Sequence, residues 1–574
     1  MSIGSRAKHT LRGHVYRLSS IVYVVLLLAW PLSAQSADLV LRHTTVYTVD
    51  AAHPTAQAVA VRAGKIVYVG DDAGVQRFIG AATRTLDLHG RFVYPGFVDA
   101  HAHFPGIGER EMTLNLEGTR TKGAFLARVA AAVQGKKPGE WVTGRGWIET
   151  FWTPQVFPTR QDLDRIAPHN PVWLTRADGH ASVANSAALR LAKITAATTS
   201  PPGGHINLDR DGQPTGMLID NAESLVYQLL PQPTETELDS AYMLASQREL
   251  SLGWTQVQDA HGSWGQVERM RRLISNGKIR IRLYKTIDGP GPGADRLIAQ
   301  GPGPVELDDH LQVRDIKIVM DGALGSRGAA LLEPYTDDPT TRGLITTDTI
   351  ALKEMLPRAL RAGVQVETHA IGDRANRIIL DLYAAAMQAV PPAERKIPNP
   401  RWRVEHAQIV SPQDLPRFKQ LGIIASMQPS HAIGDLFFAE SRLGLARLKG
   451  AYAWQTFLTM GVPVPGGSDA PVERGEPMIE FYAAVARKAL DGRSGPDNVW
   501  HPEEKVTRAQ ALKMFTWFPA YAAFEEDRHG SLVVGKAADF TVLDQDIMTI
   551  PEARIPATRN VMTIVGGEVV YRKN

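Results

Sequence analysis

Two histidines separated by a single residue, His101 and His103, directly follow a short apolar segment and could bind a metal ion. Alternate residues of an extended strand point to the same side, so both imidazoles would face one centre. Imidazole nitrogen is a common ligand of zinc and of other divalent transition metals. A single histidine more often packs in a core or lies on the surface, so the pair needs further ligands before it predicts a site.

Further ligand-type side chains recur along the chain, each within or at the end of an apolar segment. They are Lys317, His369, His406 and Asp469. Each has an ordinary explanation when taken alone: Lys317 could pair with a buried carboxylate, and Asp469 could cap the helix that follows it. Chance is a poor explanation for their order on successive apolar segments, which predicts one shared metal centre.

Eight apolar segments carry or separate these residues and alternate with helical stretches. This pattern predicts an α/β fold, the (β/α)8 TIM-type barrel with eight parallel strands. The expected strands are Phe97–Ala100, Thr255–Gln258, Ile279–Tyr284, Ile316–Met320, Val364–Thr368, Trp402–Glu405, Ile423–Met427 and Pro463–Gly466. Barrel enzymes keep their chemistry at the carboxyl ends of the strands, where the candidate ligands would meet.

The barrel is expected to occupy residues 96–529, with short β segments at the two ends of the chain. Residues 38–95 and 530–574 both contain short runs in which apolar and polar residues alternate. The two segments could join into a small split β-sandwich domain, each covering the strand edges of the other. A long interval separates the first two barrel strands, so residues 105–235 are expected to form a large insertion over the active site.

Residues 1–34 have the three-part layout of a secretory signal peptide. Four basic residues and no acidic residue precede the end of an apolar run, Ile21–Leu32, and small residues follow it. This run is shorter than the ~20 residues that cross a bilayer as a helix, which favours a cleaved leader over an uncleaved anchor. We therefore expect an exported protein, periplasmic or extracellular.

Composition excludes several kinds of site and partner. Without the leader the chain has 59 basic and 60 acidic residues, which gives no electrostatic basis for binding nucleic acid or an anionic membrane. The chain contains no cysteine, so disulfides, thiolate zinc sites and a cysteine nucleophile are excluded. The expected partner is a small-molecule substrate, with no stable membrane association after removal of the leader. A homodimer is a further expectation, because twofold homo-oligomers are common.

Six motifs contain or accompany these residues. They are Pro95–His103, Asp178–His180 with Asn185–Ser186, Lys317–Gly322, Thr368–Asp373, Val404–Gln408 and Gly467–Val472. Together they resemble the amidohydrolase superfamily, and more closely its family 3 branch, which includes enzymes similar to N-substituted formamide deformylases. The resemblance extends over nearly the whole chain after the leader. One departure is Gly328, which follows a Gly-Ser-Arg run where family members commonly have threonine.

This resemblance implies a role for each candidate ligand. His101 and His103, with Asp469, would bind one divalent ion, and His369 and His406 would bind a second. A third group, Lys317, would bridge the ions as a carbamate formed with CO2, which requires the uncharged amine that burial favours. One or two ions are expected, with zinc as the default and iron, manganese or cobalt compatible with the same ligand types.

The implied activity is hydrolysis of a C–N bond other than a peptide bond, in an amide, N-formyl or N-acyl compound. Metal-bound water would ionise near pH ~7 and attack the carbonyl carbon, and Asp469 would pass the proton to the leaving nitrogen. The same centre could cleave an ester or lactone. An exported barrel could instead sense or regulate without catalysis, although the complete ligand set argues against this alternative.

Substrate contacts are expected from four residues: His180, Trp147, His431 and Arg474. The alternative for Trp147 is a place in the core of the insertion, and for Arg474 a surface salt bridge. Three acidic residues are expected to orient histidine rings and loops: Asp321, Asp373 and Glu405.

Overall fold

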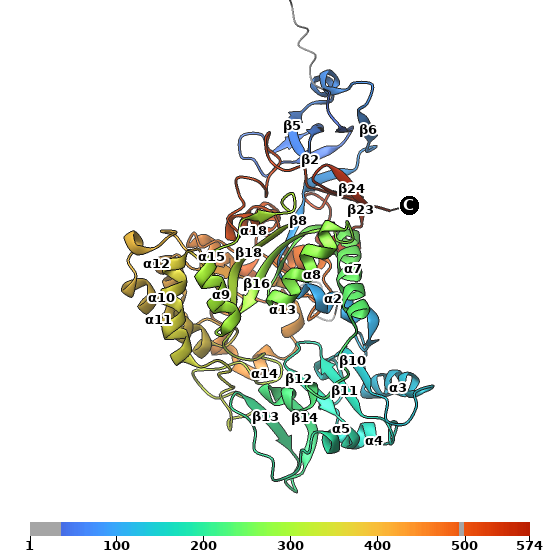
Figure 1. Ribbon diagram of the computed structural model, residues 1–574, viewed down its shortest axis with the longest axis vertical. Helices are drawn as coiled ribbons and strands as arrows, with labels where there is room; N and C mark the ends of the chain where they lie inside the picture. Colours follow the sequence, from blue (N-terminus) through green and yellow to red (C-terminus); the bar gives the residue numbers. More distant parts are fainter. Residues whose placement is uncertain (1–35, 493–498, 574) are drawn as a thin grey trace, which may run out of the picture.

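The computed structural model describes residues 36–492 and 499–573, and the expected leader, residues 1–34, lies outside them. At its centre is a parallel sheet whose strands follow one another in chain order (Figure 1). These strands are β8 (Phe97–Ala102), β15 (Trp254–Asp259), β16 (Arg282–Asp288), β18 (Leu311–Val319), β19 (Gln365–Ala370), β20 (Arg403–His406) and β21 (Ile424–Ser426).

The eighth predicted strand, Pro463–Gly466, closes the sheet between β21 and β8. Gly466 forms a parallel bridge with Met427, and its carbonyl accepts a hydrogen bond from the N–H of Ala100 at 3.2 Å. The two prolines of this segment have no N–H to donate to a ladder, which explains why it is not a regular strand. The structure therefore confirms the predicted TIM-type barrel, with one irregular strand.

One predicted strand is displaced along the chain. The sequence pattern predicts Ile279–Tyr284, whereas pairing with β15 begins only at Arg282. Ile279 and Ile281 are buried, as their apolar side chains predict, but they precede the paired residues. Apolar character thus located the buried segment without locating the start of its hydrogen-bond ladder.

Helices cover the outside of the barrel (Figure 1). They include α7 (Glu235–Leu252), α8 (Trp264–Ser275), α9 (Pro292–Gln300), α10 (Thr349–Ala362), α11 (Asp373–Ala389), α12 (Leu415–Leu421) and α16 (Pro477–Ala486). Local sequence determines where they begin and end. In α7, Thr234 and Glu237 form a reciprocal capping box, and Gly253 ends the helix with a φ of 107°.

Strands from both ends of the chain share one sheet. Its order is β24-β23-β22-β7-β2-β3, and a second sheet of order β5-β4-β1-β6 accompanies it. The strands are β1 (Leu39–Arg42), β2 (Thr45–Tyr47), β3 (Thr55–Ala56), β4 (Ala58–Arg62), β5 (Lys65–Gly70), β6 (Arg84–Asp87), β7 (Phe92–Pro95), β22 (Phe540–Leu543), β23 (Asn560–Val565) and β24 (Glu568–Arg572). Val93 of β7 lies opposite Val542 of β22, and both are buried in one apolar cluster.

The segment between the first two barrel strands contains a six-stranded sheet of its own. Its strands, in sheet order, are β13 (Gly204–Leu208), β14 (Pro214–Asp220), β12 (Ala181–Ala184), β11 (Val172–Arg176), β10 (Val142–Trp147) and β9 (Leu114–Asn115). Aromatic rings fill its core, where Phe125 packs against Trp147 and Trp152. In Figure 1 this sheet lies at the bottom of the molecule, and the sheets shared by the chain ends lie at the top.

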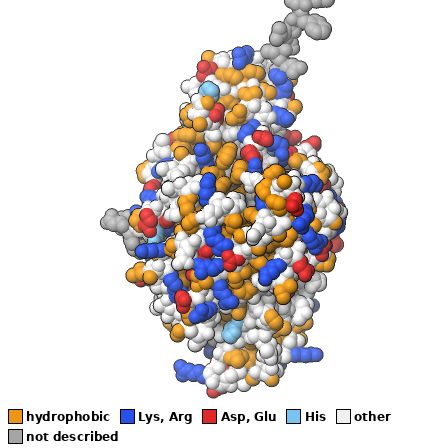
Figure 2. Space-filling model, turned by 90° about the vertical axis from the view of Figure 1, so that its left-hand side faces the viewer, with side chains coloured by type: hydrophobic (Ala, Val, Ile, Leu, Met, Phe, Trp, Pro, Cys, Tyr) orange, Lys and Arg blue, Asp and Glu red, His pale blue; other side chains and the backbone are white. Residues whose placement is uncertain are grey.

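The surface has a mixed composition. On the face drawn in Figure 2, basic and acidic side chains are interspersed with apolar ones. In the described parts of the chain, no helix combines the length and the apolar character needed to cross a membrane.

Buried charges connect the terminal sheets to the barrel. His529 lies between two carboxylates, with Nε2 2.7 Å from Asp309 Oδ2 and Nδ1 3.3 Å from Asp539 Oδ2. Asp539 also pairs with Nε of Arg282 at 2.7 Å. Burial alone would lower the pKa of His529, but the two carboxylates outweigh it and raise the pKa to about 9. The imidazole is therefore charged at neutral pH.

This charge predicts a dependence of stability on alkaline pH. The pKa of an unfolded histidine is about 6.5, so the raised pKa stabilises the fold fully below that pH, and the stabilisation is lost as the pH rises through about 9. We expect His529 to contribute about 3 kcal/mol to the free energy of unfolding at the acidic end of this window. Chemical denaturation across the window should show a flatter dependence for His529→Gln than for the wild type. Parallel curves would contradict the assignment.

Candidate metal centre

A cavity of about 370 Å³ lies between the carboxyl ends of the barrel strands and the inserted sheet. This volume is in the range of sites for small molecules. Five of the candidate ligands line it: His103, Lys317, His369, His406 and Asp469. The sixth, His101, is fully buried beside them, and the centroid of its ring lies 4.9 Å from that of His406.

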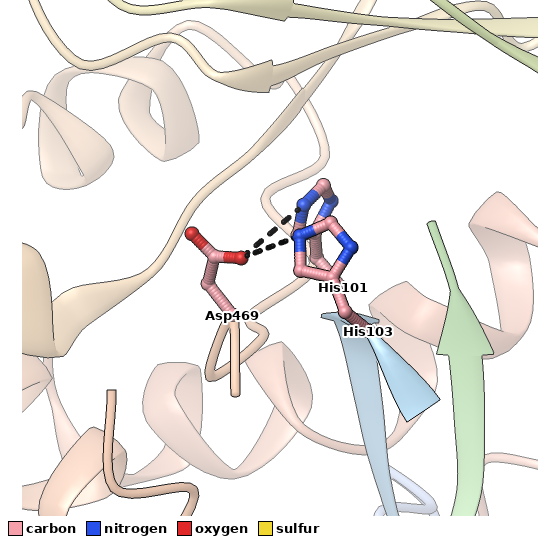
Figure 3. A group of neighbouring side chains, drawn as sticks. All are labelled: His101, His103 and Asp469. Carbon is pink, nitrogen blue, oxygen red and sulfur yellow. Dashed lines mark ion pairs between the residues drawn. The ribbon is translucent and has the colours of Figure 1, made fainter. Parts of the chain in front are cut away.

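His101 and His103 converge on the carboxylate of Asp469, as Figure 3 shows. His101 belongs to β8, and His103 follows the end of this strand. Nε2 of His103 lies 3.1 Å from Oδ1 of Asp469, and Nε2 of His101 lies 3.7 Å from the same oxygen. Three potential ligand atoms thus surround one point, although they come from opposite ends of the chain.

The spacing of these atoms suits a tetrahedral divalent ion. Ligands about 2.0–2.1 Å from zinc lie roughly 3.3–3.4 Å apart in a tetrahedron. The observed separations of 3.1 and 3.7 Å lie on either side of that value. Oδ1 of Asp469 is buried and accepts no hydrogen bond from the described residues. A buried carboxylate oxygen without a partner is costly unless a cation balances it, so these residues fit a metal ion.

A second group of ligand-type atoms shares Asp469. Nε2 of His431 lies 3.4 Å from Oδ2 of Asp469 and forms no hydrogen bond with the described residues. His406, His431 and Asp469 each place a ligand atom within 4.8 Å of the others. The ring of His369 packs against that of His406, with 4.5 Å between centroids. The structure therefore brings together the four histidines predicted as ligands and adds His431 to them.

Lys317 lies in the wall of the same cavity, within β18. The residue is only 3% exposed, and its Nζ lies 3.4 Å from Nε2 of His101. No carboxylate of the described residues forms an ion pair with it, in contrast to Lys285, which pairs with Asp259 at 2.6 Å. Lys317 is thus a buried amine that faces the histidine cluster, with the buried carboxylates of Glu367 and Glu405 near it but not in an ion pair with it.

Residues behind the centre fix the orientation of two rings. Nδ1 of His101 lies 2.6 Å from Oε2 of Glu405, and Nδ1 of His406 lies 2.7 Å from Oε1 of Gln428. When Nδ1 donates to such an outer partner, Nε2 is left as the free ligand atom. Glu405 thus occupies the orienting position that the sequence predicts for it.

The other two acidic residues predicted to orient the site hold loops. Asp321 accepts hydrogen bonds from the N–H groups of Ile371 at 3.0 Å and Gly372 at 2.8 Å. Asp373 accepts one from the N–H of Leu332 at 2.8 Å. These bonds connect the loop after β18 to the loop after β19, which follows His369.

Asp99 connects the first barrel strand to the segment that carries Asp469. Its Oδ1 accepts the N–H of Ser468 at 2.8 Å, and its Oδ2 accepts the hydroxyl of Ser468 at 2.5 Å. Oδ1 also accepts the N–H of His101 at 3.3 Å. Burial raises the pKa of Asp99 to about 7 in spite of these bonds. The carboxyl group of Asp99 therefore connects the two sides of the metal centre.

Burial also sets the charge of the ligands. It lowers the pKa of His101, His369 and His406 well below the ordinary value, so these rings are neutral, the form that binds metal. Burial alone would raise the pKa of Asp469, but the neighbouring imidazoles outweigh it and hold the pKa well below its usual range. These neutral imidazoles and the ionised carboxylate have the protonation states that a metal ion requires. The ring of His431 differs, because Asp469 outweighs burial and raises its pKa to about 9.

Two residues of the centre adopt a left-handed backbone conformation. The φ angle is 58° at Asp469 and 73° at His406. The left-handed region costs an ordinary L-residue roughly 1–2 kcal/mol, and such residues occur often at functional sites. The fold thus accepts a less favourable backbone conformation at His406 and Asp469, where the chain turns and both side chains face the cavity.

The predicted substrate contacts His180 and His431 both line the cavity. Nδ1 of His180 lies 2.7 Å from Oδ1 of Asp220. Burial alone would lower the pKa of His180, but Asp220 outweighs it and raises the pKa to about 9. The ring of His180 also packs against His369, with 5.1 Å between centroids. His180 therefore joins the insertion to the metal centre.

The other two predicted contacts do not reach the cavity, so their ordinary explanations hold. Trp147 is fully buried in the core of the insertion, where its Nε1–H donates to the carbonyl of Leu174 at 2.9 Å. The side chain of Arg474 is 54% exposed and pairs with Glu476 at 2.7 Å. Neither is among the described residues that line the cavity.

Sequence reasoning missed four polar residues of the cavity wall: Arg145, Arg176, His261 and Asp435. The two arginines belong to β10 and β11 of the insertion. The sequence contains a signal for them, because both lie at or near the ends of strand-like runs, as the barrel ligands do. That signal could be read only with the knowledge that this sheet faces the barrel.

The fold and the ligand set together define a metal-dependent hydrolase built on a TIM-type barrel. The amidohydrolase family model matches residues 84–571, and the chain belongs to this family, in the family 3 branch that the motifs predict. Protein LONG AFTER FAR-RED 3 of Arabidopsis thaliana is 34% identical over 97% of each chain. The N-substituted formamide deformylase of Arthrobacter pascens is 29% identical over 94% of this chain and 99% of its own.

A solved structure has the same architecture. It is that of an uncharacterized metal-dependent hydrolase from Pyrococcus horikoshii OT3, with a TM-score of 0.70 and 25% sequence identity. The match covers 90% of this chain and 99% of the other. The similarity therefore includes more than the barrel.

The contact between Glu405 and His101 predicts an effect on metal retention. Glu405→Gln keeps the shape of the side chain but removes the charge that orients and polarises the ring, so metal affinity should fall by about 10- to 100-fold. Competition with a chelator would measure this affinity. Glu503→Gln is a matched control, because Glu503 pairs with His501 at 2.9 Å on the surface. Equal affinities in the two variants would show that Glu405 does not support the centre.

Proposed function

We propose that this protein is a hydrolase that cleaves a C–N bond of a small amide, N-formyl or N-acyl compound. The observation that carries the proposal is the convergence of the histidines and Lys317 on Asp469 at one cavity. Its kinship with the N-substituted formamide deformylase supports C–N over C–O cleavage.

Each ligand has a place in this proposal. His101, His103 and Asp469 would hold one divalent ion, and His369 and His406 would hold a second. Zinc is the default for these ligand types. Bound ions of this kind supply Lewis acidity and a hydroxide nucleophile at neutral pH. The ring packing of His369 against His406 would give the second pair of ligands a fixed geometry.

Lys317 would act as a carbamate formed from its amine and CO2. The carbamate carries a negative charge, whereas the protonated amine would place a positive charge beside the metal ligands. Lys317 is buried, and its Nζ lies 3.4 Å from Nε2 of His101, which places the amine among the proposed ligands. Carboxylation would supply anionic oxygen ligands at the point where the two groups of histidines meet.

Asp469 would move the proton during hydrolysis. Its carboxylate is ionised and lies at the cavity surface, so it can accept a proton from the attacking water. His431, 3.4 Å from Oδ2, would hold the carboxylate in position during this step. The protonated Asp469 would then donate to the nitrogen of the leaving amine, which is a poor leaving group unless it is protonated.

Metal content tests the role of Lys317. Protein purified without added metal should contain about two divalent ions per chain, and Lys317→Ala should contain one or none, because the bridging ligand is lost. Elemental analysis measures both values. Lys353→Ala, which changes an exposed lysine of α10, should match the wild type. Wild-type protein that binds no metal even with zinc and bicarbonate would reject the binuclear mechanism.

Hydrolysis tests the role of Asp469. Release of amines from a panel of N-formyl and N-acyl compounds should fall by about 10²- to 10⁴-fold in Asp469→Asn, the usual contribution of a general acid–base. The exposed Asp527 provides a control variant, Asp527→Asn, which should keep full activity. Metal-loaded wild type that cleaves esters or lactones but none of these amides would reject C–N specificity. Binding of compounds without any cleavage would favour a sensing protein.

A further inference from the structure

One arginine in the cavity wall forms no ion pair with the described residues. Arg145 belongs to β10 of the insertion and lines the cavity opposite the barrel. Its one hydrogen bond among the described residues runs from Nη2 to the carbonyl of Ala177 at 3.1 Å. Its Nε is buried and has no hydrogen-bond partner there. Gly179 lies against the guanidinium, since a Cβ at Gly179 would be 3.2 Å from Nη2.

The neighbouring Arg176 shows what a neutralised arginine looks like in the same wall. Its Nε lies 2.8 Å from Oε2 of Glu149, and its Nη1 pairs with Asp178. Both arginines come from adjacent, parallel strands of the inserted sheet. The protein therefore places two carboxylates on Arg176 and none on Arg145, among the residues that the structure describes.

Other carboxylates in the cavity wall are already engaged. Asp178 pairs with Arg176, and Asp469 belongs to the metal centre. Asp435 accepts hydrogen bonds from Gln408 Nε2 at 2.5 Å and from the hydroxyl of Tyr452 at 2.6 Å. None of them forms an ion pair with Arg145 in the described structure.

A buried guanidinium without a counter-ion is unfavourable for the free protein. Burial lowers the pKa of Arg145 below its usual value, which shows the same cost in another form. Arginine presents a planar fork of N–H donors that matches a carboxylate, and such pairs are among the strongest hydrogen bonds in proteins. Apolar residues, including Ile148, Leu324 and Phe438, form other parts of the wall.

We propose that Arg145 binds a carboxylate of the substrate, so that the preferred substrates are N-acyl or N-formyl amino acids and similar acids with one negative charge. The inference rests on the proposed function and adds the substrate class to it. The metal centre would act on the amide carbonyl while Arg145 holds the acid group of the same molecule. A single arginine beside apolar residues suits one carboxylate and an apolar side chain better than a multiply charged phosphate.

Direct binding can test this inference without turnover. The probes are N-formyl-, N-acetyl- and N-benzoylglycine, each compared with the neutral amide of the same acid. Isothermal titration calorimetry on the metal-loaded protein should show tighter binding of the acids. In Arg145→Met the affinity for the acids should fall by at least tenfold, and the affinity for the neutral amides should change by less than threefold. Arg145→Lys keeps the positive charge but not the planar fork of N–H donors, so its affinity for the acids should lie between those of the wild type and Arg145→Met.

Arg165→Met is the matched control, because Arg165 lies on the same insertion with its side chain 69% exposed and should leave both affinities unchanged. Wild-type protein that binds acids and amides equally, or binds neither, would overturn the inference. An unchanged ratio in a folded Arg145→Met protein with normal metal content would do the same. If acids bind through Arg145 but no amide is cleaved, the proposed function fails and the carboxylate site stands. If amides are cleaved without regard to Arg145, only the inference fails.

Discussion

The metal centre depends on the close approach between the first barrel strand and the segment that follows the eighth. A Cβ at Gly467 would lie only 2.5 Å from the backbone nitrogen of His101, so a larger residue would force the two segments apart. The N–H of Asp469 donates to the carbonyl of His101 at 2.7 Å, and Asp99 bonds to Ser468. These contacts close the barrel and bring the ligands together at once, because the closing residues are neighbours of the ligands themselves.

Closure of the barrel also buries titratable side chains, and the residues around them reduce the cost of this burial. Burial keeps the rings of His101 and His406 neutral, whereas Asp469 raises the pKa of His431 to about 9. The contacts with His103 and His431 in turn hold the pKa of Asp469 well below its usual range. Beneath them Glu405 anchors His101, and Arg403 lies 3.8 Å from the buried carboxylate of Glu367. Buried charges cost several kcal/mol each unless they are paired. The partly unpaired carboxylate of Asp469 therefore indicates where a cation belongs.

The cavity has two walls of different origin. Barrel residues supply the groups that could bind metal and move protons, whereas the insertion supplies Arg145, Arg176 and His180. His180 contacts the barrel residue His369, so the insertion is held close to the metal centre. This arrangement separates the reacting groups from those that surround the rest of a substrate. Substitutions in the inserted sheet could alter the substrate preference without disturbing the metal-binding residues.

The sequence by itself determined the barrel and the residues that meet at its carboxyl end. Strand periodicity placed His101 and His103 on one side, and the order of apolar segments placed Lys317, His369, His406 and Asp469 at one face, because parallel strands present the same ends together. Only the tertiary structure decided the rest. Trp147 and Arg145 lie two residues apart on β10, yet one is buried in the core of the insertion and the other lines the cavity. On a regular strand both would share one face, but the register of β10 against β11 shifts between them, at Gly146 with a φ of 103°. Local sequence could show neither this irregularity nor which side of the inserted sheet the distant barrel covers.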